Sequence, residues 1–250
     1  MPPILNIAAY RFVRIEEPAQ LREPIAAKAE ALGLKGTVLV APEGINLFLA
    51  GEPAALRGFL EWLRQDARFT GLAAKESWSA AVPFARLKVK LKREIIAFRR
   101  EGVDPVAAPA PAVDPPTLKR WLDTGVDDEG RRVVLLDTRN REEVALGTFE
   151  GAITLPIDDF VALPEALQSE RHRLDGATVV SFCTGGIRCE KAAPWLRQAG
   201  FGDIRQLAGG VLGYFEAVGG AHWRGGCFVF DDRVALGPDL LPMGKGDSPA

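Results

Sequence analysis

The chain has 250 residues, of which 47% are hydrophobic and 26% are charged, and its formal net charge is −2. This composition supplies apolar surface for one large or two small domains, and it excludes a protein that coats nucleic acid through overall positive charge. Three cysteines without a paired framework, no apolar run long enough to span a bilayer and no signal-like N-terminus predict a cytoplasmic protein without a membrane partner.

Residues 1–102 are expected to form one α+β domain. The patterns predict strands over 4–12, 36–40, 45–49 and 86–91, and helices over 18–32 and 52–66. The order strand, helix, strand, strand, helix, strand folds most simply as a ferredoxin-like, or acylphosphatase-like, sandwich. In that fold both helices cover one face of an antiparallel sheet.

The last predicted strand of this domain carries alternating cations, at Arg86, Lys88, Lys90 and Lys92. Successive side chains of a strand point to opposite faces, so these four share one face and the apolar residues between them share the other. In a slightly acidic chain, this clustering favours a contact with an RNA backbone. A solvated outer face is the alternative.

Residues 103–116, rich in proline and alanine, are interpreted as an extended linker. After it, residues 117–226 are expected to form an α/β domain, in which strands and helices alternate and build a doubly wound parallel sheet. Asp137 and Arg139, which follow its first strand, are expected to form a buried structural ion pair. Residues 227–250 are interpreted as a C-terminal strand and a flexible tail, with Cys227 as a structural cysteine.

The most informative motif follows the apolar strand 177–182, where a helix is predicted to begin: Cys183, Thr184, Gly185, Gly186, Ile187 and Arg188. Free backbone N–H groups at a helix N-terminus and a nearby arginine lower the pKa of a cysteine, and glycines let the main chain fold around the sulfur. Ligands of such sheets bind beyond the carboxyl ends of the strands. The motif therefore predicts a reactive Cys183 thiolate supported by Arg188.

Two neighbouring features limit the chemistry of this loop. It has one residue fewer than the loop of cysteine phosphatases, and Phe182 stands where those enzymes usually carry a histidine. The shorter ring favours a thiolate or its persulfide over a bound phosphate. Two histidines in unrelated positions predict no metal site.

Cys189, six positions after Cys183, has two interpretations. It is a resolving cysteine that forms a disulfide with Cys183 or accepts its sulfur, or it is a small residue that packs under the loop.

Three segments resemble, in order and spacing, the signatures of a rhodanese domain: 137–139, 147–153 and 183–188. With 36–46, 86–90 and 227–234, nearly the whole chain resembles the bacterial rhodanese-containing tRNA uridine hydroxylases. This resemblance implies Cys183 as the nucleophile, molecular oxygen as co-substrate with no other cofactor, and tRNA as partner through its anticodon loop. The implied reaction converts wobble uridine 34 to 5-hydroxyuridine. The chain departs from the family at Leu47 and Phe48, and it lacks the cysteine-rich tail of longer relatives.

Two other functions remain compatible with the sequence. A sulfurtransferase that acts on thiosulfate or a persulfide would use the same loop, whereas a non-catalytic binding module would not need both Cys183 and Arg188. The basic strand and the extent of the resemblance favour tRNA. The sequence gives no indication of the oligomeric state.

Overall fold

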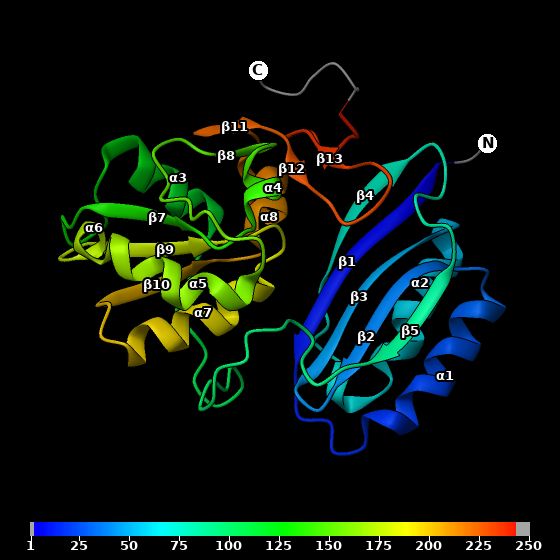
Figure 1. Ribbon diagram of the computed structural model, residues 1–250. Helices are drawn as coiled ribbons and strands as arrows, with labels where there is room; N and C mark the ends of the chain where they lie inside the picture. The colour runs from blue at the N-terminus through cyan, green and yellow to red at the C-terminus, as the bar shows by residue number, and fades with distance from the viewer. Residues whose placement is uncertain (1–2, 244–250) are drawn as a thin grey trace. The chain divides into compact units, whose positions relative to one another are not determined.

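The computed structural model describes residues 3–243, which form two compact units (Figure 1). Of the described residues, unit 1 contains 3–97 together with the short segment Phe230–Arg233. Unit 2 contains Phe98–Val229 and residues 234–243.

Unit 1 is a five-stranded sheet with two helices, and its strands lie in the order β4-β1-β3-β2-β5. Its elements are β1 (Ile4–Phe12), α1 (Pro18–Ala31), β2 (Lys35–Ala41), β3 (Gly44–Gly51), α2 (Pro53–Arg64), the 3₁₀ helix η1 (Ala67–Phe69), β4 (Ala74–Ser79) and β5 (Leu87–Leu91). The first four strands pair antiparallel, and β5 pairs parallel with β2. The predicted sandwich is therefore confirmed, with a mixed sheet in place of a purely antiparallel one.

The predicted strand order missed β4, which is the strand that completes the ferredoxin-like arrangement. Trp78 is the only large apolar residue in this strand, so the sequence shows no alternating pattern there. β4 forms because its backbone pairs with β1 at the edge of the sheet, with Leu5 opposite Trp78. The basic strand predicted to complete the fold is instead a fifth strand on the opposite edge.

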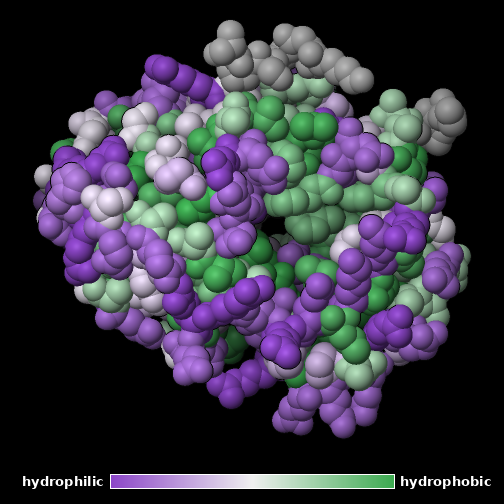
Figure 2. Space-filling model, in the orientation of Figure 1, coloured by the Kyte–Doolittle hydropathy of each residue, from purple (hydrophilic) through white to green (hydrophobic). Residues whose placement is uncertain are grey.

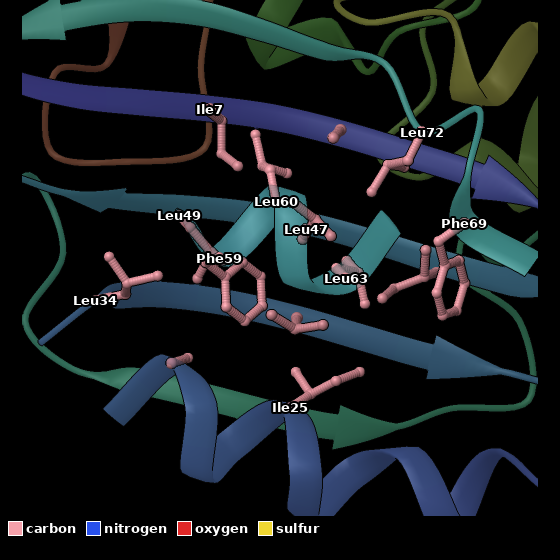
Figure 3. Close-up of a cluster of buried hydrophobic side chains, with 14 of the residues drawn as sticks. Ile7, Ile25, Leu34, Leu47, Leu49, Phe59, Leu60, Leu63, Phe69 and Leu72 are labelled. Atoms are coloured by element: carbon pink, nitrogen blue, oxygen red, sulfur yellow. The ribbon is translucent and has the colours of Figure 1, made fainter. Parts of the chain in front are cut away.

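The core of unit 1 lies between the sheet and its two helices (Figure 3). Ile7 and Leu47 point from the strands toward Ile25 of α1 and Phe59 of α2. All four side chains are buried, with at most 3% exposed. Burial of a side chain of this size stabilises a fold by about 1.5–3 kcal/mol, so this cluster fixes which face of each strand points inward.

Unit 2 is built on a parallel sheet with the strand order β6-β10-β9-β7. Its strands are β6 (Ala112–Val113), β7 (Val133–Asp137), β8 (Gly147–Phe149), β9 (Thr178–Phe182), β10 (Asp203–Leu207), β11 (Trp223–Gly225), β12 (Cys227–Phe228) and β13 (Ala235–Leu236). Its helices are α3 (Pro115–Thr124), α4 (Arg141–Val144), η2 (Phe160–Ala162), α5 (Leu163–Ala166), η3 (Leu167–Glu170), α6 (Arg171–Leu174), α7 (Ile187–Gln198) and α8 (Gly210–Val218). The predicted parallel α/β architecture is confirmed.

Two segments outside the main pattern are more ordered than the composition indicates. The end of the proline-rich segment forms edge strand β6, in which Ala112 and Val113 lie between Pro111 and Pro115 and pair with β10. The C-terminal β12 pairs with β13, and the backbone N–H of Met243 donates to Ala235. The remainder of the expected flexible tail, residues 244–250, lies outside the described residues.

Candidate active site

The Cys183 loop connects the end of β9 to the start of α7. Every residue of β9 is buried, which fixes the point at which the strand ends. Gly186 caps α7 with a φ of +99°, a left-handed conformation that glycine adopts at little cost. Cys183 itself is only 1% exposed. The local sequence thus turns the chain sharply around a buried sulfur.

Several donors converge on the Cys183 sulfur. The backbone N–H of Gly186 donates to Sγ at 3.1 Å, and the backbone N–H of Arg188 and the thiol of Cys189 also donate to it. Burial alone opposes ionisation. These hydrogen bonds and the positive charge of Arg188 outweigh it and lower the pKa of Cys183 to about 6. The site therefore holds a thiolate at neutral pH, as the motif predicted.

The guanidinium of Arg188 is held by a carboxylate that the sequence analysis did not identify. Its two terminal nitrogens donate to the Glu143 oxygens at 3.1 and 2.8 Å. Both side chains are buried, with 6% and 0% exposed. The same carboxylate accepts the backbone N–H of Asn140 at the start of α4. The Asn-x-x-Glu spacing of a capping box could have identified Glu143 as a helix-start residue, although not as the partner of Arg188.

Cys189 lies in the first turn of α7 and is 0% exposed. Its sulfur is 3.7 Å from the Thr138 hydroxyl, at the end of β7, and it hydrogen-bonds to Cys183. Burial, together with that bond, raises the pKa of Cys189 well above its ordinary value. The pair therefore consists of one thiolate and one neutral thiol, an arrangement compatible with both interpretations of Cys189.

The start of α8 holds the loop from the other side. The backbone N–H groups of Val211 and Leu212 each donate at 3.0 Å, to the carbonyls of Cys183 and Thr184. A Cβ atom on Gly210 would lie 2.5 Å from the Cys183 carbonyl oxygen, so only glycine permits this approach. The Gly-Gly pair that follows β10 was the available sequence signal for a close backbone contact.

The predicted ion pair between Asp137 and Arg139 is confirmed. Arg139 donates to the two Asp137 oxygens at 2.9 and 2.6 Å, and both side chains are fully buried. Thr148 donates to the same carboxylate at 2.8 Å, and Arg139 also donates to the Gly147 carbonyl. This network joins the end of β7 to the start of β8, which is a structural role.

Cys227 is fully buried in β12, opposite Leu236. Burial raises its pKa to about 12, so its thiol stays neutral at physiological pH. These properties are those expected of a structural cysteine.

The predicted basic residues lie in unit 1, on and beside β5. Val89 is half-buried and packs against the core, whereas Arg86, Lys88, Lys90 and Lys92 are exposed. The register pairs Lys88 with Thr37 and Lys90 with Leu39, on the face of the sheet away from the helices. Figure 2 shows hydrophilic side chains along the visible surface over β5.

Residues 3–243 contain neither a metal-binding cluster nor a membrane-spanning helix. No group of three or more histidine, cysteine, aspartate or glutamate side chains is arranged to hold a metal ion. Nor does any helix in this part of the chain have the length and apolar character needed to cross a membrane.

Two family models match the chain, one in each unit. The UPF0176 acylphosphatase-like domain matches residues 4–95, and the rhodanese-like domain matches residues 115–217. Both agree with the fold described above.

Close relatives extend this similarity to nearly the full length. The chain is 58% identical over 243 residues to the tRNA uridine(34) hydroxylase of Xanthomonas campestris pv. campestris (strain B100), covering 97% of this chain and 96% of the relative. It is 60% identical over 240 residues to the tRNA uridine(34) hydroxylase of Variovorax paradoxus (strain S110), covering 96% and 91%. Among solved structures, the rhodanese-like domain of the Anabaena sp. Alr3790 protein is 24% identical, with a TM-score of 0.38 over 56% of this chain and 90% of that one.

Proposed function

The chain belongs to the family of tRNA uridine(34) hydroxylases, and we propose that it converts uridine 34 of tRNA to 5-hydroxyuridine with molecular oxygen. The observation that supports a role for this chain's own residues is the buried Cys183 thiolate, held by backbone N–H groups and Arg188. In this proposal Cys183 is the nucleophile.

A nucleophile is needed because C5 of uracil reacts poorly with oxygen. Attack of the Cys183 thiolate at C6 converts the ring to an enolate, whose electron density lies on C5. Because its pKa is lowered to about 6, most of Cys183 is ionised at pH 7. The sulfur is therefore ready to attack without a separate general base.

The enolate then reacts with oxygen at C5. One oxygen atom remains on the ring, and the other leaves as water. Loss of the C5 proton and release of Cys183 from C6 restore the aromatic ring. The overall conversion consumes one uridine, one O₂, two electrons and two protons, and it yields one 5-hydroxyuridine and one water.

Arg188 and Glu143 act together in this scheme. The ion pair fixes the guanidinium beside the sulfur, where its charge stabilises the thiolate before attack and again when Cys183 leaves. Arg188 thereby supports Cys183 as a leaving group as well as a nucleophile. Glu143 is a positioning residue that acts through Arg188.

The tRNA partner is bound in part by β5. Arg86, Lys88, Lys90 and Lys92 offer four exposed cations on one face of unit 1, which suits the phosphates of an RNA backbone. Uridine 34 lies in the single-stranded anticodon loop, whose bases can be turned out of the stack into an enzyme site. The enzyme is expected to work in the cytoplasm, where tRNA is modified.

The test is nucleoside mass spectrometry of unmodified tRNA incubated with the protein in air and in the presence of a thiol reductant. Product that requires both oxygen and Cys183, judged against Cys183→Ser, is the expected result. Folded wild-type protein that makes no 5-hydroxyuridine would refute the proposal. Turnover of thiosulfate by the same preparation would then favour the sulfurtransferase, which uses the same loop.

A failure to trap a covalent adduct with tRNA containing 5-fluorouridine would contradict attack at C6 while leaving the overall reaction intact. Arg197→Gln, an exposed change at the far end of α7, is the matched control for Arg188→Gln in these assays. Of these two variants, we expect only Arg188→Gln to reduce adduct formation.

A further inference from the structure

The proposed reaction needs two electrons, and it leaves Cys189 without a role. Cys189 is fully buried, and its thiol donates a hydrogen bond to the Cys183 sulfur. Two buried cysteines, one at the end of β9 and one in the first turn of α7, can be linked by a disulfide, whose formation releases two electrons and two protons. This pair can therefore supply the two electrons that the hydroxylation requires.

We propose that Cys183 and Cys189 are a dithiol that supplies the electrons for hydroxylation and ends each turnover as a disulfide. The inference rests on the proposed function. It identifies the source of reducing power at the same site, and it gives Cys189 a chemical role in place of a packing role.

Each step balances. Addition of O₂ and a proton to the C5 enolate gives a C5 hydroperoxide, while Cys183 remains bonded to C6. The Cys189 sulfur attacks the terminal oxygen of the hydroperoxide, which breaks the O–O bond, leaves a hydroxyl on C5 and forms a sulfenic acid on Cys189. Loss of the C5 proton then expels Cys183 as a thiolate and yields 5-hydroxyuridine.

The Cys183 thiolate next attacks the sulfur of the Cys189 sulfenic acid. A disulfide forms, and the hydroxide that leaves takes up a proton and becomes water. In sum, uridine, O₂ and two thiols give 5-hydroxyuridine, water and one disulfide. An external thiol reductant returns the disulfide to the dithiol before the next turnover.

The surroundings of the pair suit this sequence. Cys183 follows the fully buried strand β9 and Cys189 lies in the first turn of α7, and two glycines stand in the segment between them. The Thr138 hydroxyl, 3.7 Å from the Cys189 sulfur, donates to the Phe182 carbonyl at 3.0 Å and so ties the surroundings of that sulfur to the end of β9. Burial of both sulfurs protects them from oxidation by other routes.

The test is a single-turnover experiment without reductant. Fully reduced wild-type protein is desalted without exposure to oxygen, mixed with an equal amount of unmodified tRNA and then exposed to air. We expect about one 5-hydroxyuridine per chain, after which the reaction stops. We also expect a disulfide between Cys183 and Cys189. Trypsin cleaves after Arg188, between the two cysteines, so the disulfide is detected as two peptides held together.

Two variants at Cys189 complete the test. Cys189→Ser and Cys189→Ala are expected to form at least tenfold less product without reductant, and millimolar dithiothreitol is expected to restore part of it by replacing the missing thiol. Cys227→Ser, which removes the structural cysteine, is the control and should still yield about one product per chain. The disulfide readout on wild-type protein requires no variant, so a folding defect of a variant does not decide the outcome.

The outcomes separate this inference from the proposed function. If wild-type protein makes no 5-hydroxyuridine even with dithiothreitol, the proposed function is refuted and this inference falls with it. If wild-type protein makes product while Cys189→Ser matches it without reductant, or while all three cysteines remain as thiols, the dithiol alone is refuted.

Discussion

Replacing Cys183 should change how the stability of the protein depends on pH. Its pKa is lowered from an ordinary value of 9.0 to about 6, a difference that corresponds to about 4 kcal/mol when fully expressed. Because the native state releases the proton at lower pH than the unfolded state does, the thiolate stabilises the native state as pH rises. This contribution is complete above pH 9 and is lost as pH falls through 6.

The magnitudes follow from these two values. Relative to Cys183→Ala, wild-type protein should gain about 1 kcal/mol between pH 5.5 and 7, and about 3–4 kcal/mol between pH 5.5 and 9. The measurement is urea unfolding of both proteins at these three pH values under a non-thiol reductant. The transition that is followed is the unfolding of unit 2, which contains Cys183. Titrating groups that do not interact with Cys183 cancel in the difference between the two proteins.

The control is Cys227→Ala. Its raised pKa, about 12, makes the native state hold its proton longer than the unfolded state, so its stability effect begins only above pH 9. Its difference curve from wild type should be flat between pH 5.5 and 8.5. If the curve for Cys183→Ala were equally flat, to within 1 kcal/mol, the native state would not hold a stabilised thiolate and the reasoning would fail.

Three further predictions follow from the site and from β5. Glu143→Gln removes the carboxylate partner of a buried guanidinium and should cost about 3 kcal/mol in urea unfolding. Glu142→Gln, on the exposed face of the same helix, should cost less than about 0.5 kcal/mol, and equal effects would contradict a buried pair. Gly210→Ala forces a Cβ to 2.5 Å from the Cys183 carbonyl oxygen and should slow single-turnover hydroxylation about tenfold or more. Gly176→Ala is the control, because its backbone is equally left-handed but no atom lies within 4 Å of the added Cβ, and it should not slow the reaction. The double variant Lys88→Glu, Lys90→Glu should weaken tRNA binding and lower the slope of log affinity against log salt by about 1–2. The charge-matched control Lys28→Glu, Arg57→Glu, on the two helices, should leave the slope unchanged. An unchanged slope in the β5 double variant would mean that β5 does not contact tRNA.

Much of the fold follows from local patterns in the sequence. Strands and helices with clear hydrophobic patterns, such as β1, β3 and α2, form where the pattern predicts them. β4 could not be predicted from such a pattern, since its residues are mostly polar and its position is fixed by backbone pairing with β1. The same limit applies to β6, which pairs with β10 through the backbone although it lies in a proline-rich segment.

The charge pattern on β5 was also readable from the sequence, because alternation along a strand assigns each side chain to a face whatever the neighbouring strand is. The position of β5 at the edge of the sheet could not be read from the sequence. It depends on tertiary structure, because β4 pairs at one edge of the sheet, beside β1, and β5 pairs parallel with β2 at the other.

The reactive loop was accessible because its parts are contiguous. Cys183, Gly186 and Arg188 lie within six residues, and the strand that precedes them and the helix that follows place the backbone N–H groups around the sulfur. A short stretch of chain thus determines the thiolate, and no long-range contact is needed to expect it.

Tertiary structure alone decided what surrounds that thiolate. Glu143 is 45 positions from Arg188 and Thr138 is 51 positions from Cys189, and they meet because β7 and β9 are neighbours in the parallel sheet and end at the same edge. The start of α8 reaches the loop because β10 lies on the other side of β9. Local sequence specifies which residue is reactive, whereas the order of the strands selects its partners, because contacts between distant segments depend on how the whole core packs.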